Sequence, residues 1–373
     1  MTALHRAVRA RSPAAVAALL SAGADLSRQR RGASGSTTSA WEKLAAGPLR
    51  SASGRPPAVL REGPVHRVGL EERVGRDGRW QRFPGYCSVM HVSDEYVPVL
   101  GRSMTVRRPD GPIRGGVVAL HCATSPERDQ PLFGHLADTL TPLGYAVASY
   151  DRRRHDGGGV PLHDQATDAL AGLEYLRERI GAPVGLYGFS QGAWAASVAA
   201  ARSADVAFLA VLGCSGVSPA AQMRHFTDES LRRAGHGEAE RAAANRIRLA
   251  VEAVLRGEGD RDELAALLDA ATGEPWWPLA WLPDHVPAPG GWADMDFDPE
   301  PTFARVTCPT LLMYGEDEEN VPAAPSIAVW RRASPADLTV ETIARCGHFP
   351  SPDGGQRRSD IASAYGDVLA AWF

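Results

Sequence analysis

Residues 183–196 read PVGLYGFSQGAWAA, and this stretch decides the fold. The apolar run 184–187 precedes the pentapeptide GFSQG at 188–192, and an alanine-rich run typical of a helix follows. We therefore predict a strand, a sharp turn and a helix, with Ser190 at the turn. The two glycines of such a G-x-S-x-G turn let the strand and helix backbones approach closely, so that the serine hydroxyl points away from the sheet. Ser190 then lies at a helix N-terminus, where unpaired N–H groups and the helix dipole stabilise negative charge.

The composition is that of an ordinary globular protein. The 373 residues are 44% hydrophobic, 23% charged and carry a net charge of −4, so nucleic acid is not an expected partner. The five cysteines are scattered and show no C-x-x-C spacing, which argues against a disulfide framework and a zinc site. We expect a cytoplasmic protein with no cofactor and no metal. No segment is long and apolar enough to predict a membrane span.

The first 60 residues are predicted to form a separate helical segment and linker. Residues 2–8 (TALHRAV) and 17–25 (AALLSAGAD) resemble one ankyrin repeat, whose consensus T-P-L-H-x-A precedes an L-L-x-x-G-A-D end. The arginines near the N-terminus, followed by an apolar run, also fit a short secretory signal. The ankyrin interpretation is favoured because it covers more positions. Residues 27–57 are rich in Arg, Gly, Ser, Thr and Pro, as in a linker.

Apolar strands alternate with helical patterns along most of the remaining chain. The main domain is predicted to consist of two parts of the chain, residues 61–215 and residues 302–373. The first part is expected to begin with antiparallel strands. Strands are expected at 115–121, 145–150, 184–187, 206–212, 310–314 and 338–343, and helices at 132–143, 162–180, 324–332 and 359–373. This alternation indicates an α/β fold with a mostly parallel sheet, helices on both faces, and a ligand site at the carboxyl ends of the strands.

The alternation stops between residues 216 and 301. Helical stretches at 238–256 and 261–271 precede a run rich in Trp and Pro, and we predict an inserted helical cap over the active site. Trp276, Trp277 and Trp281 in this run either fill the core between cap and sheet or line an apolar substrate pocket. Because caps and N-terminal arms often mediate contacts between copies, a homodimer is a further hypothesis.

A serine hydroxyl needs an adjacent base, and the base needs a carboxylate to orient it. Among the histidines after Ser190, only His348 follows a late strand; His225, His236 and His285 fall in the predicted cap. His348 is therefore the candidate base. The candidate acid lies just after the strand at 310–314, where residues 315–322 read GEDEENVP and hold four carboxylates.

These motifs resemble those of the α/β-hydrolase superfamily. Residues 315–322 are similar to its G-x-x-D-x-x-V-P turn, in which the catalytic acid lies three residues after the glycine and four before the proline. Both anchors place Glu318 in that role, and Asp317 takes it if the turn is shifted by one residue. Residues 121–129 and 150–155 resemble two loops of dienelactone-hydrolase-like and prolyl-oligopeptidase-like bacterial serine esterases, H-G-(S/G)-G-P-x-D-R-(D/N) and Y-D-x-R-G-x-G. The resemblance covers about residues 115–373.

The resemblance implies a triad of Ser190, Glu318 and His348. It also implies an oxyanion hole built from the N–H groups of Ala123 and Gln191. Cys122 stands where the family has glycine, which predicts a tighter or re-shaped hole. We interpret the Cys122 thiol as a small side chain at the substrate pocket rather than as a nucleophile.

The implied activity is hydrolysis of a carboxylic ester or thioester, through an acyl-enzyme on Ser190, with a small-molecule acyl substrate. Three alternatives stay open. They are a peptidase-like amidase, a non-hydrolytic biosynthetic enzyme (acyl transfer, C–C cleavage or cyclisation), and an ankyrin-bearing interaction protein with a catalytically dead hydrolase part. The intact serine, acid and histidine speak against the last.

Overall fold

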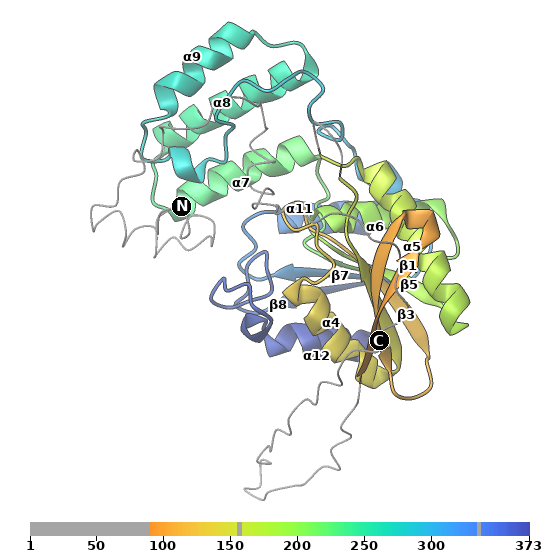
Figure 1. Ribbon diagram of the computed structural model, residues 1–373. Coiled ribbons are helices and arrows are strands. Elements are labelled where there is room, and N and C mark those ends of the chain that lie inside the picture. Colours follow the sequence, from red (N-terminus) through yellow and green to blue (C-terminus); the bar gives the residue numbers. More distant parts are fainter. Residues whose placement is uncertain (1–89, 155–158, 334–336) are drawn as a thin grey trace, which may run out of the picture.

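A computed structural model describes residues 90–154, 159–333 and 337–373 of the chain. The described part is built around an eight-stranded sheet with the strand order β1-β2-β4-β3-β5-β6-β7-β8 (Figure 1). The ankyrin-like repeat and the linker lie outside the described residues, as do residues 61–89, where the antiparallel strands were predicted to begin.

The sheet is mostly parallel, with an antiparallel pair at one edge. β1 pairs with β2, and β2 with β4, in antiparallel fashion, and all the other neighbours are parallel. The expected strands are present, although the one expected at 206–212 begins only at Leu209. The strands are β1 (Met90–Val97), β2 (Arg102–Pro109), β3 (Gly115–Leu120), β4 (Tyr145–Tyr150), β5 (Val184–Phe189), β6 (Leu209–Leu212), β7 (Thr310–Gly315) and β8 (Leu338–Ile343).

Helices cover both faces of this sheet. Because side chains alternate along a strand, Val117 of β3 packs into one hydrophobic cluster and Val118 into the other. The first cluster lies under α4 (Pro131–Leu140) and α12 (Ser363–Trp372), and the second lies under α5 (Leu162–Ile180), α6 (Gln191–Arg202) and α11 (Ala323–Ala333). Burial on both faces explains why the central strands read as continuous apolar runs, and the predicted fold class is confirmed. Short helices complete the domain: η2 (Pro98–Leu100), η3 (Thr141–Leu143), α10 (Glu300–Phe303) and η5 (Arg358–Asp360).

Residues 216–301, called the helical region below, hold a hydrophobic cluster of their own. The region contains α7 (Pro219–Arg233), α8 (Glu238–Arg256), α9 (Arg261–Ala271) and η4 (Trp277–Leu279). Figure 1 shows α7, α8 and α9 gathered beyond one end of the sheet. Both α8 and α9 have the predicted bounds, whereas α7 was not predicted. Its sequence signal is Ser218-Pro219: the Ser218 hydroxyl caps the helix by accepting the N–H of Ala221, and proline occupies the first helical position.

Among the described residues, no helix combines the length and the apolar character needed to cross a membrane.

Candidate active site

Ser190 occupies the turn between β5 and α6. Its φ and ψ are 56° and −118°, a backbone conformation that costs a non-glycine residue on the order of 1–3 kcal/mol. The turn is held because the Ser190 N–H donates to the Leu212 carbonyl at 2.9 Å. Gly192 is required for the same turn, since a Cβ there would lie 2.6 Å from the carbonyl oxygens of Leu120 and His121. The predicted strand, turn and helix are thus present.

His348 is paired with Glu318. The Nδ1 atom of His348 lies 2.8 Å from Oε1 and 3.0 Å from Oε2 of Glu318, and both side chains are buried. The same Oε1 accepts the N–H groups of Asn320 (2.9 Å) and Val321 (3.1 Å), which fixes the carboxylate. Asp317 is exposed on the same turn. The structure therefore brings Glu318, and not Asp317, to His348.

The Glu318 contact decides which ring nitrogen of His348 is available for chemistry. A carboxylate accepts hydrogen bonds, so the proton lies on Nδ1 and the lone pair on Nε2. That Nε2 is buried and has no hydrogen-bond partner among the described residues. The ring packs 5.1 Å from the ring of Phe189, and it lies against Gly213, where a Cβ would come within 2.7 Å of Cε1. His348 and Ser190 line the same cavity.

Two further carboxylates of the segment 315–322 hold the loop that carries His348 in place. Glu319 accepts the backbone N–H of His348 at 3.0 Å, and Glu316 accepts that of Arg345 at 2.9 Å. Arg345 has a φ of 59°, which is a strained conformation for a residue other than glycine. The hydrogen bond to Glu316 is made at this strained residue. Neither contact could be predicted from the sequence, because backbone N–H partners depend on how two distant loops meet.

The loop after β3 and the start of α6 carry the two residues expected at the oxyanion hole. Ala123 lines the cavity beside Ser190, and Gln191 is the first residue of α6, so its N–H has no acceptor within the helix. Cys122 also lines the cavity and is half-buried, with its Sγ 3.7 Å from the Thr124 hydroxyl.

Arg152, which sequence reasoning missed, contacts both segments that carry these two N–H donors. It donates to the carbonyls of Cys122 (2.9 Å) and Ala123 (2.8 Å) and to Oε1 of Gln191 (2.9 Å). Burial lowers the pKa of Arg152, which stays charged at neutral pH. Arg152 occupies the variable position of the Y-D-x-R motif, so nothing in the pattern marked it.

We predict that Arg152→Met lowers kcat about 10- to 100-fold on an activated ester and changes KM little. Loss of the three hydrogen bonds frees the Ala123 loop, and misplaced oxyanion donors weaken binding of the transition state more than binding of the substrate. Arg153→Met is the matched control, because Arg153 pairs with Asp168 instead. Equal effects of both substitutions on kcat would show that Arg152 has only a general structural role.

His121 is a buried neutral imidazole next to this loop. Burial, assisted by the charge of Arg152, lowers the pKa of His121 to about 3. Its ring packs edge-on against Phe133 and Tyr150. His121 therefore supports the loop and does not exchange protons near neutral pH.

This burial predicts a loss of stability in acid. Between pH 6.5 and about 3 the unfolded chain binds a proton at His121 that the folded chain does not, so the free energy of unfolding falls as the pH falls. The slope from this residue is about 1.4 kcal/mol per pH unit. His121→Asn, which does not titrate, should show a flatter dependence of Tm on pH over this window; an unchanged slope would contradict the assignment.

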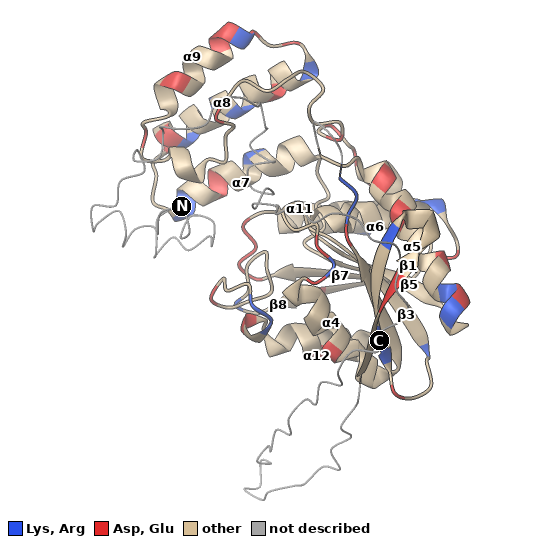
Figure 2. Cartoon of the chain, viewed as in Figure 1, with Lys and Arg blue, Asp and Glu red and all other residues tan. Residues whose placement is uncertain are grey.

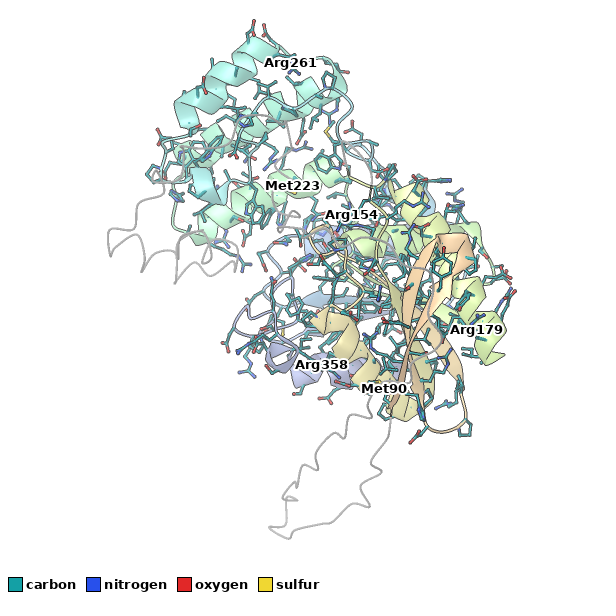
Figure 3. The ribbon with its side chains drawn as sticks, in the orientation of Figure 1. Met90, Arg154, Arg179, Met223, Arg261 and Arg358 are labelled. Carbon is teal, nitrogen blue, oxygen red and sulfur yellow. The ribbon has the colours of Figure 1, made fainter. Side chains whose placement is uncertain are left out.

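The cavity has a volume of about 150 Å³ and lies between the sheet domain and α7. Gln222, Met223 and Phe226 of α7 contribute one wall, and Met223 is labelled in Figure 3. No Asp, Glu, Lys or Arg of the described chain lines it. The full lining is Cys122, Ala123, Thr124, Ser125, Gln130, Pro131, Leu132, Phe189, Ser190, Gln222, Met223, Phe226, Trp281, Asn320, His348, Phe349 and Gln356.

Of the three tryptophans considered for this pocket, only Trp281 lines it. Trp276 is buried in the cluster of the helical region, and Trp277 packs against that cluster. The pocket role is therefore wrong for Trp276 and Trp277. They pack in the helical region's own cluster and not between that region and the sheet, so the alternative interpretation is not confirmed either. Their position in sequence could not separate the possible outcomes, because all three tryptophans lie in one short run rich in Trp and Pro. Within the described chain, no cluster of His, Cys, Asp and Glu is arranged to hold a metal ion.

Comparisons with known proteins identify the family of the chain. The protein-family model described as "Alpha/beta hydrolase family" matches residues 117–358. Among curated proteins, none matches the chain. Similar solved structures include Est1E from Butyrivibrio proteoclasticus, with 16% identity, 75% of this chain and 96% of that chain covered, and a TM-score of 0.47. Another is a proline iminopeptidase from Mycobacterium smegmatis, with 16% identity, 75% and 97% covered, and a TM-score of 0.46. The family match spans well over half of the sequence, and the chain belongs to the alpha/beta hydrolase family.

Proposed function

We propose that the protein is a serine hydrolase that cleaves a carboxylic ester or thioester through an acyl-enzyme on Ser190. The observation that carries this proposal is the buried His348–Glu318 pair. The Nε2 atom of His348 has no partner among the residues that the structure describes, and the imidazole lines the same cavity as the strained Ser190. Nucleophile, base and orienting carboxylate are the three parts that acyl transfer to serine requires.

In the first half-reaction, Nε2 of His348 takes the Ser190 proton while Oγ attacks the substrate carbonyl carbon. The N–H groups of Ala123 and Gln191 hold the oxyanion that forms. Glu318 stabilises the imidazolium without taking its proton. His348 then gives the proton to the leaving alcohol or thiol. In the second half, water deprotonated by His348 attacks the acyl-enzyme and releases the carboxylic acid.

The lining of the cavity favours an uncharged substrate. A peptidase that binds a free N-terminal amine gains from a carboxylate in its pocket, and none of the described carboxylates lines this one. Amide groups of Gln222, Asn320 and Gln356 instead offer neutral hydrogen bonds beside apolar walls. An ester is also an easier bond to cleave than an amide. We propose further that the helical region is the cap of this site, since α7 provides one wall of the cavity.

Hydrolysis is tested by running the reaction on short acyl esters in water enriched in ¹⁸O. The proposal expects the released carboxylic acid to carry one ¹⁸O atom, because water enters at the deacylation step. Acyl transfer to another acceptor, or release of a product that contains no solvent oxygen, would contradict it. The experiment therefore separates hydrolysis from the non-hydrolytic alternatives.

A further inference from the structure

Trp281 holds a strained backbone at the wall of the cavity. Three non-glycine residues of the described chain have a positive φ: Ser190, Trp281 and Arg345. The first forms the nucleophile turn and the third lies in the loop that carries His348. Trp281, with a φ of 55°, is the second, and it lines the cavity with its ring centroid 5.4 Å from that of Phe226. Strain of this kind persists only where the surroundings enforce it.

A buried arginine on α8 donates hydrogen bonds to the main chain at this position. Nη2 of Arg248 donates to the carbonyls of Trp281 (2.6 Å) and Ala280 (2.8 Å) and to the hydroxyl of Thr227 on α7 (3.0 Å). The Thr227 hydroxyl in turn donates to the Ala280 carbonyl at 2.9 Å. Arg248 is 4% exposed. The main chain at Trp281 is therefore fixed to both α7 and α8.

The charge of Arg248 belongs to a network inside the helical region. Burial lowers the pKa of Arg248 to about 10, while the carboxylate of Glu252, one turn along α8, opposes that shift. Glu252 is itself buried and pairs with Arg224 of α7. Acidic and basic residues both occur on α8 (Figure 2). Buried ion pairs are weak sources of stability, and their better-attested effect is to specify one geometry, here that of α7 against α8.

We propose that Trp281 is a specificity-determining residue and that Arg248 is the positioning residue that holds it. Trp281, packed on Phe226, closes the α7 side of the cavity and limits the size of the substrate group that lies there. The cavity of about 150 Å³ is small and its lining carries no charged side chain among the described residues, so the substrate class is an ester with a short, neutral acyl chain. This inference rests on the serine hydrolase function proposed above.

The test compares kcat/KM for p-nitrophenyl acetate, butyrate and octanoate. Glycine is the substitution of choice at Trp281, because it tolerates a positive φ and keeps the carbonyl that Arg248 contacts. We expect the wild type to prefer the short esters. Trp281→Gly should raise the octanoate-to-acetate ratio of kcat/KM at least tenfold, mainly through a lower KM for octanoate. Trp277→Ala is the matched control, because Trp277 lies outside the cavity lining, and it should leave the ratio unchanged.

Arg248→Met tests the positioning role, since it keeps the volume of the side chain and removes its donors. We expect the ratio to move in the same direction as in Trp281→Gly, by a smaller factor. Thr227→Val removes the neighbouring contact to Ala280 and serves if Arg248→Met does not fold. Tm is measured for every variant. If Arg248→Met has a lower Tm but an unchanged octanoate-to-acetate ratio of kcat/KM, Arg248 stabilises the fold and does not position Trp281.

The outcomes separate the two proposals. An unchanged ratio in folded Trp281→Gly, with acetate still hydrolysed, overturns the specificity role and leaves the serine hydrolase function standing. A wild type that prefers octanoate also overturns the specificity role. A folded wild type that hydrolyses none of the esters overturns both.

Discussion

Ser190→Ala is expected to lower kcat on an activated ester by about 10⁵- to 10⁶-fold, and His348→Ala is expected to do the same. Without the hydroxyl there is no acceptor for the acyl group, and without the imidazole the hydroxyl keeps its proton. Because the two side chains act as one unit, the double variant should lose no more than either single variant. The measurement is kcat on p-nitrophenyl acetate for all three proteins, with folding checked by circular dichroism.

The activity that remains in the Ser190 and His348 variants is also predicted. The oxyanion donors and the cavity remain in these variants, so some acceleration over the uncatalysed reaction should survive. Losses that multiply in the double variant, or a single loss below about 100-fold, would show that Ser190 and His348 do not act together.

Glu318→Gln is expected to lower kcat by about 10³- to 10⁴-fold. The amide removes the charge that stabilises the imidazolium, and its NH₂ group favours the tautomer in which Nε2 carries the proton. Asp317→Asn removes one negative charge from the adjacent position, where the side chain is exposed, and should change kcat less than about threefold. The two variants form a matched pair, assayed on the same ester.

The opposite pattern would transfer the role of acid to Asp317. Glu318→Asp adds a second check, because it keeps the charge but shortens the side chain that now lies 2.8 Å from Nδ1. We expect Glu318→Asp to retain more activity than Glu318→Gln.

The features that could be predicted from the sequence depend on local patterns. The turn at Ser190 follows from glycines two residues to either side, which are needed wherever strand and helix backbones meet so closely. The strands were found because burial on both faces leaves continuous apolar runs. The resemblance to the α/β-hydrolase turn assigned Glu318 over Asp317 through two anchors, Gly315 and Pro322, and the structure does bring the Glu318 carboxylate to His348.

The features that could not be predicted depend on contacts between distant segments. Arg152 has three acceptors from the β3 loop and α6, and no local pattern marks which of several arginines meets them. The wall formed by α7 was missed because most of the residues of this helix are polar and few of them are buried, although the Ser218-Pro219 start was readable. Trp276 and Trp281 are five positions apart in sequence, yet one fills a core and the other lines the cavity.

The central claim, an activated Ser190, is tested most directly by a fluorophosphonate probe. Wild type and Ser190→Ala are incubated with the probe side by side, and the intact mass of each protein is measured. The account predicts one stoichiometric adduct on the wild type and none on Ser190→Ala, because only a serine with a base and an oxyanion hole attacks the phosphorus. A folded wild type that gains no mass, or an equal adduct on both proteins, would contradict it.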